Sequence, residues 1–150
     1  MPPLASFSPS INYARFATVA IPTNSPTTKV LTTAGGVITM TVLELLCGLL
    51  RVDTQDAQTL TTPTAAAIVA GINGCMVGAS FDLDVINYGD STLTIGLGAG
   101  VTKVTVAGVS TVLTLATLTC KRFKLVVTNN LVGSEAVEIY GFGSTAAAVA

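Results

Sequence analysis

The second half of the chain alternates between apolar and polar residues with a period of two, and this pattern constrains the fold more than any other feature. Apolar side chains occupy every second position within residues 81–85, 93–97 and 123–127. Successive side chains of a β-strand point to opposite faces of a sheet, so this alternation is typical of strands with one buried face. Strands that recur at intervals of roughly 8–12 residues predict a mainly β fold, an antiparallel, jelly-roll-like β-sandwich.

The ends of several strands can be placed from turn residues. Gly89-Asp90 lies between two alternating runs and predicts a hairpin turn. Residues 129–133 read as another turn, before a last strand at 136–142. Further short strands are expected at residues 36–41, 51–53, 104–106 and 112–115.

Two short helices are expected before the alternating region. Thr41 and Glu44 have the spacing of a capping box, in which each side chain bonds the backbone N–H of the other residue. A leucine-rich helix should follow and end near Gly48. Thr62-Pro63 has the cap-then-proline pattern of a second helix start, and residues 65–72 form its apolar body.

Composition favours a structural role over catalysis. The chain has 23 threonines, is 50% hydrophobic and only 10% charged, and contains neither His nor Trp. Histidine is the usual group that titrates near neutral pH, so we expect no enzyme, no catalytic residue and no cofactor. A net charge of −1 gives no basic footprint for nucleic acid. Cys47, Cys75 and Cys120 are an odd number without CxxC spacing, which predicts buried free thiols and no metal site.

The mean hydropathy of +0.71 is high for a soluble monomer, so the chain either enters a membrane or is partly covered by neighbours. The uncharged run 57–81 contains Pro63, Gly71, Asn73 and Gly74, and the run 104–120 is shorter than the ~20 residues a spanning helix needs. Residues 1–10 lack the basic start and apolar run of a signal peptide. We therefore expect no membrane span, and surfaces covered by other protein.

Residues 1–34 are expected to form an extended N-terminal arm, followed by a sandwich domain at 35–143 and an apolar tail at 144–150. Prolines in the arm oppose a regular helix. Its apolar residues are costly to leave in water, and they are the candidate partner-binding residues: Ile11, Tyr13, Phe16, Val19 and Ile21. The alternative is a disordered tail, because chain termini are often loose.

Two pairs of charges have matching spacing. Asp82 and Asp84 share one face of a strand, and Arg122 and Lys124 share one face of another. If these strands are neighbours, the four residues form a cross-strand ladder on the solvent face. The alternatives are that the charges are separately solvated, or that the two aspartates form an acid–base pair or a calcium site, although no adjacent loop supplies the oxygen ligands that calcium needs.

Several short motifs occur in a fixed order along residues 35–143. They are Gly-Val-Ile-Thr at 36–39, Glu-Leu-Leu-Cys-Gly-Leu at 44–49, Leu-Thr-Thr-Pro-Thr-Ala-Ala at 60–66, Val-Gly-Ala-Ser-Phe at 77–81, Val-Ile-Asn at 85–87, Lys-Arg-Phe at 121–123, Val-Val-Thr-Asn at 126–129 and Gly-Ser-Glu-Ala-Val at 133–137. In this pattern the chain resembles small β-sandwich virion proteins of large double-stranded DNA viruses and tailed phages.

The resemblance implies a virion structural protein, made in the host-cell cytoplasm. Members of this group resemble capsid decoration, cap or fibre-associated proteins. The expected role is therefore an oligomeric capsid decoration or minor capsid component that binds and stabilises the shell. Its expected partners are copies of itself, in a trimer, and other capsid proteins. The alternative is a fibre-tip module for a host glycan or receptor, for which the five Phe and three Tyr offer few stacking platforms.

Overall fold

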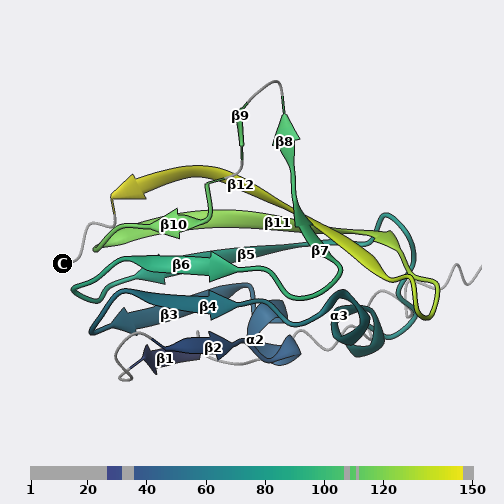
Figure 1. Cartoon of the computed structure of the whole chain (residues 1–150), viewed down its shortest axis with the longest axis horizontal. Helices are drawn as coiled ribbons and strands as arrows, with labels where there is room; N and C mark the ends of the chain where they lie inside the picture. The colour runs from purple at the N-terminus through teal and green to yellow at the C-terminus, as the bar shows by residue number, and fades with distance from the viewer. Residues whose placement is uncertain (1–26, 32–35, 107–108, 111, 147–150) are drawn as a thin grey trace, which may run out of the picture.

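The computed structural model describes residues 27–31, 36–106, 109–110 and 112–146, and it is mainly β, with two principal sheets (Figure 1). The six-stranded sheet has the order β1 (Thr27–Leu31), β3 (Leu49–Thr54), β5 (Ser80–Asn87), β11 (Thr119–Asn129), β12 (Ala136–Ala146) and β7 (Val101–Lys103). The four-stranded sheet has the order β10 (Thr114–Leu115), β6 (Leu93–Gly96), β4 (Gln58–Thr61) and β2 (Val37–Thr39). A small ribbon of β8 (Thr105–Val106) and β9 (Val109–Ser110) projects from the body in Figure 1.

From β1 to β6 the chain crosses from one sheet to the other after every strand. As a result β1, β3 and β5 are parallel neighbours in one sheet, and β2, β4 and β6 are parallel neighbours in the other. Leu50 faces Val85 across the first sheet, and Thr59 faces Thr94 across the second. This half of the molecule is a flattened coil of three turns, each turn contributing one strand to each sheet.

The predicted antiparallel arrangement is therefore wrong for this half, and a jelly-roll order is not confirmed. Among the described residues, five of the nine strand pairings are parallel. The alternation of apolar residues reports which side of a strand is buried, and it is the same whether the chain then turns back beside the strand or crosses to the opposite sheet.

The Gly89-Asp90 turn shows the difference directly, because it joins β5 to β6 in the other sheet and is not a hairpin. The Asp90 N–H donates to the carbonyl of Thr54 at 2.9 Å, so this corner stacks on the preceding corner. A Cβ on Gly89 would lie 2.0 Å from the Thr54 nitrogen. Glycine is required here by the close approach of two backbones.

The remaining strands close the coil with antiparallel pairings. The 11-residue strand β11 pairs antiparallel with β5 on one side and β12 on the other, and β10 pairs antiparallel with β6. Strand β12 continues to Ala146, past the expected start of the C-terminal tail at 144. At the other end of the chain, β1 belongs to the sheet although residues 27–31 fall within the expected arm.

Helix α2 (Val42–Leu46) confirms the predicted capping box. The Glu44 N–H donates to Thr41 Oγ1 at 3.2 Å, and the Thr41 N–H donates to Glu44 Oε2 at 2.7 Å. Helix α3 (Ala65–Gly71) is capped by Thr64, whose Oγ1 accepts from the Ala67 N–H at 3.2 Å.

The expected start of the second helix at Thr62-Pro63 is two residues too early. The hydroxyl of Thr62 instead accepts from the Gly98 N–H at 2.9 Å and ties the β4 end to the loop after β6. Neither α2 nor α3 is long and apolar enough to cross a membrane, and no other helix of that kind occurs within the described ranges.

The core lies between the two sheets, and Leu45 of α2 and Ile68 of α3 extend it beyond the strands. The six-stranded sheet contributes the larger share of the fully buried side chains: Leu50, Val52, Val85, Phe123, Leu125, Val127 and Val137. The four-stranded sheet contributes Leu60, Leu93 and Leu115. Burial of each large apolar side chain contributes about 1.5–3 kcal/mol, which makes this layer the main source of stability.

Candidate interaction surfaces

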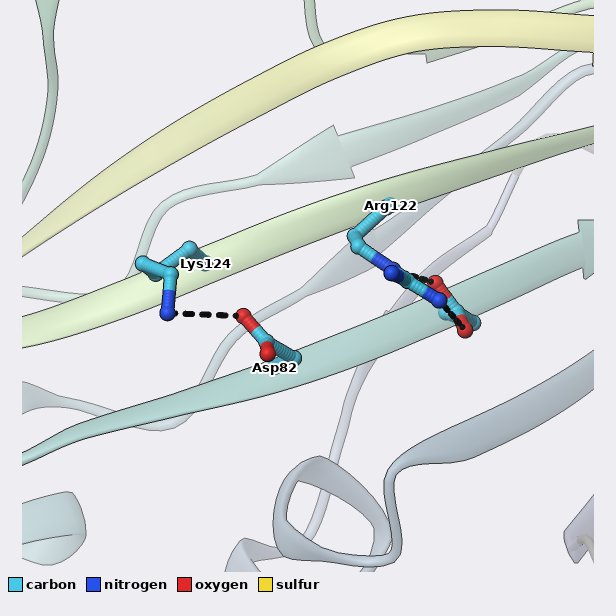
Figure 2. A network of polar contacts seen from close by, with 4 residues as sticks. Asp82, Arg122 and Lys124 are labelled. Carbon is cyan, nitrogen blue, oxygen red and sulfur yellow. Dashed lines mark hydrogen bonds and ion pairs between the residues drawn. The ribbon is translucent and has the colours of Figure 1, made fainter.

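The predicted charge ladder is confirmed on the outer face of the six-stranded sheet. Arg122 of β11 pairs with Asp84 of β5, and Lys124 pairs with Asp82 two residues along, in the register of the two strands. Figure 2 shows the side chains of Arg122 and Lys124 reaching toward the neighbouring strand. The Arg122 guanidinium donates Nε–H to Asp84 Oδ1 at 2.7 Å and Nη2–H to Oδ2 at 2.8 Å, whereas Lys124 Nζ lies 3.2 Å from Asp82 Oδ1.

This arrangement holds the Asp84 carboxylate in its charged form. The hydrogen bond from Arg122 lowers the pKa of Asp84, although partial burial opposes the shift. The same contact raises the pKa of Arg122 above its ordinary value. Within the part of the chain that the structure describes, no group of three His, Cys, Asp or Glu side chains could hold a metal ion. The two aspartates are ion-pair partners that help to keep β5 and β11 in register.

Other charges gather on the same outer face. Arg51 lies 4.9 Å from the centre of the Tyr88 ring, and the Tyr140 hydroxyl donates to Glu138 Oε2 at 2.7 Å, which raises the pKa of Tyr140. By strand alternation, seven of the fifteen formally charged residues of the chain face outward here: Arg51, Asp53, Asp82, Asp84, Arg122, Lys124 and Glu138. This face is suited to water.

The outer face of the four-stranded sheet is different, because none of its outward-facing residues in β2, β4, β6 and β10 is charged. One row crosses all four strands, and a second row crosses three. The first consists of Val37, Thr59, Thr94 and Thr114, and the second of Thr39, Thr61 and Gly96. We call these seven residues the threonine face. It presents methyl and hydroxyl groups without a charge to desolvate.

A buried asparagine, which sequence reasoning missed, joins two corners of the coil to the end of β10. Asn87 is fully buried, and its Nδ2 lies within hydrogen-bond distance of the carbonyls of Ser91 (2.8 Å), Ala116 (3.1 Å) and Leu115 (3.3 Å). Its Oδ1 accepts from the Thr54 hydroxyl at 3.0 Å. The signal was available, because Asn87 continues the inward positions of β5. Its satisfied bonds indicate a structural role.

Lys121 is another buried polar residue, and it carries a charge. It is 5% exposed, and Nζ donates to the carbonyl of Val112 and lies 5.8 Å from the centre of the Phe123 ring. Burial lowers the pKa of its ammonium group. The alternation that turns Arg122 and Lys124 outward also turns Lys121 inward, so this signal was present in the sequence too.

The three cysteines are free thiols, as expected, but each is only partly buried. Cys47 Sγ donates to the carbonyl of Glu44 at 2.8 Å. Burial raises the pKa of the Cys75 and Cys120 thiols, which keeps them protonated and weakly nucleophilic.

The predicted partner-binding residues Ile11, Tyr13, Phe16, Val19 and Ile21 lie outside the described residues. The described residues define a two-sheet β protein with one charged outer face and one uncharged outer face. Comparison with protein-family models, curated proteins and solved structures finds no match to this chain.

Proposed function

We propose that this chain is a virion structural protein, an oligomeric capsid decoration or minor capsid component that stabilises the shell. The observation that carries the proposal is the contrast between the two outer faces. Seven charges lie on the six-stranded sheet, whereas the threonine face has none. The cores of protein–protein interfaces are depleted of charged residues, so the threonine face is the side suited to contact with protein.

The N-terminal arm is the second contact in this proposal. Its candidate anchors are Ile11, Tyr13, Phe16, Val19 and Ile21. Each large apolar side chain contributes about 1.5–3 kcal/mol when fully buried, so a few anchors tether a subunit. Ordering the backbone costs about 1–2 kcal/mol per residue, and a partner surface offsets that cost.

The assignment to a virus particle comes from the resemblance of the motifs in residues 35–143 to small virion proteins. That resemblance also favours a trimer, other capsid proteins as partners, and synthesis in the host cytoplasm. Low net charge supports close packing of copies, because self-repulsion is small.

The oligomer is tested by sedimentation velocity and light scattering of the full chain at micromolar concentration. We expect an oligomer that is weakened by Thr39→Lys and Thr114→Lys, which place charge at exposed positions of the threonine face. Ser80→Lys is the matched control, since Ser80 is an exposed outward residue of the charged face. A stable monomer for the unaltered chain contradicts the proposal.

The arm is tested separately by deletion of residues 1–24, which stops short of β1. The shortened chain should keep its circular dichroism spectrum and assemble less well. Assembly equal to that of the full chain makes the arm a passive tail. The virion assignment is tested by mass spectrometry of purified virus particles for peptides of this chain.

A further inference from the structure

Two loops meet at one end of the molecule, where α3 leads into β5 and β11 turns into β12 (Figure 1). Asn130 Nδ2 donates to the carbonyl of Cys75 at 3.0 Å, which places the two loops in contact. The Gly78 N–H donates to the carbonyl of Val127 at 2.8 Å and anchors the first loop on the end of β11. The two loops therefore form one surface.

This surface exposes four large apolar side chains, two from each loop. On the first loop Met76 is 68% exposed and Val77 60%, and on the second loop Leu131 is 67% exposed and Val132 96%. We call these four residues the apolar tip. Residues 72–79 contain no charge, and the only charge in residues 130–135 is Glu135. Exposed apolar residues that gather on two loops in contact mark interaction sites.

The backbone of both loops is held by internal hydrogen bonds. Cys75 and Ala79 donate their N–H groups to the carbonyls of Ile72 and Met76, at 3.1 and 3.0 Å. In the second loop, Ser134 N–H donates to the carbonyl of Leu131 at 2.9 Å, and Gly133 N–H donates to Glu135 Oε2 at 3.0 Å. An unsatisfied N–H is costly in an apolar medium, so these bonds lower the cost of taking the tip out of water.

Area decides between a second copy of the chain and a lipid surface. At the usual coefficient, complete burial of one such side chain removes about 60–120 Å² from water, so four remove at most ~500 Å². Two tips packed together would bury about 1,000 Å², below the ~1,200 Å² of the smallest standard protein–protein interfaces. A bilayer has no such minimum, because it accepts apolar loop residues one at a time in proportion to their area.

We propose that the apolar tip dips into the surface of a neutral lipid bilayer, as a peripheral contact independent of the virion role. Basic residues are what attract proteins to anionic lipids, and the two loops have none. Binding should therefore occur on zwitterionic phosphatidylcholine and persist at high salt.

The absence of Trp from the chain allows a direct test. Val132→Trp places one fluorophore on the tip, and Thr117→Trp places it at an exposed position beside the start of β11, at the opposite end of that 11-residue strand. With phosphatidylcholine vesicles, we expect V132W emission to shift to the blue and to be quenched by brominated lipid. T117W emission should not change.

Adding Leu131→Asp to V132W should weaken vesicle partitioning about tenfold or more. Vesicle flotation of the unaltered chain, which has no Trp, and of its L131D variant tests binding without the fluorescent probe. Matching circular dichroism spectra establish that the variants fold. No blue shift with vesicles overturns the proposal, as does binding that needs anionic lipid and survives L131D. A blue shift that grows with protein concentration without lipid assigns the tip to a second copy and also overturns it.

Discussion

The Arg122 guanidinium donates two parallel hydrogen bonds, of 2.7 and 2.8 Å, to the Asp84 carboxylate on the neighbouring strand, across the pairing of β11 with β5. Bidentate pairing of this kind fixes the orientation of both side chains, which a single lysine contact does not. The neighbouring pair of Lys124 and Asp82 has one contact of 3.2 Å. The two rungs of the ladder are therefore unequal, and each can be removed separately.

Removing Arg122 should change the titration of Asp84. In the folded protein Arg122 lowers the pKa of this carboxyl below 3.8, and Arg122→Ala should return it toward that value. Because the folded pKa is depressed, the stabilisation by Asp84 is present above its unfolded pKa and is lost as the pH falls through its folded pKa. Carbon-detected NMR titration measures the shift. Lys124→Ala is the control and should leave the titration of Asp84 in place; an unchanged pKa in R122A would contradict the assigned cause.

The cap of α2 should contribute measurably to stability. Thr41→Ala removes the acceptor for the Glu44 N–H and should lower the free energy of unfolding by about 1 kcal/mol, with a smaller loss for Glu44→Ala. Urea unfolding measures both. Leu43→Ala provides the control on the same helix, since Leu43 is exposed. Identical urea midpoints for T41A and the unaltered chain would show that the capping bond makes no net contribution to the free energy of unfolding.

Loss of the buried Asn87 amide should be more costly. Asn87→Ala leaves the carbonyls of Leu115 and Ala116 without their hydrogen-bond donor at a buried corner. We expect the free energy of unfolding to fall by about 2–4 kcal/mol. The comparison is Asn130→Ala, which removes the side-chain hydrogen bond to the Cys75 carbonyl in a partly buried loop and should cost about 1 kcal/mol. Equal losses in urea unfolding would mean that the corner relaxes to find other donors.

Lys121 should make stability rise with pH on the alkaline side. Its folded pKa lies below 10.5, so between the two values the unfolded chain binds more protons than the folded chain. The free energy of unfolding then increases as the pH rises through that window. Lys121→Met should abolish this rise and leave stability at neutral pH equal or higher, because a buried charge is exchanged for an apolar side chain.

Urea midpoints measured at increasing pH check this prediction, with Lys124→Met as the control on the partly exposed side of the same strand. Two results would count against it: an alkaline rise that persists in K121M, or a loss of more than about 1.5 kcal/mol at neutral pH, which would mean that the bond to Val112 outweighs desolvation.

Local chemistry was predictable from the sequence, and sheet assignment was not. The capping box of Thr41 and Glu44 depends on spacing within one element, and the structure confirms it. The pairing of Asp84 with Arg122 was predicted from matching spacing on two strands, on the condition that the strands are neighbours, and the structure confirms that too. The route of the chain depends on contacts between distant corners. Gly89-Asp90 carries the residues of a hairpin turn, yet its backbone bonds to Thr54 and leads into the other sheet.

For the candidate surfaces, too, the features of single strands were predictable from the sequence, and the contacts between distant segments were not. Period-two alternation identifies outward threonines such as Thr59 and Thr94, but their alignment in one row requires the parallel register of β4 and β6. Leu131 and Met76 lie 55 residues apart in the sequence, and their loops are brought together by tertiary bonds such as those from Asn130 to Cys75 and from Gly78 to Val127.

The buried corner at Asn87 also bears on how the protein is made. On the ribosome, Asn87 is synthesised 28 residues before its acceptor Leu115, and until then the only carbonyl available to its amide among its native acceptors is that of Ser91. A nascent chain that has completed β6 therefore cannot close this corner, even though all three turns of the coil have been synthesised. The corner can close only after Ala116 has emerged from the ribosome, so a chain truncated between Asn87 and Leu115 should unfold readily and be recognised by chaperones.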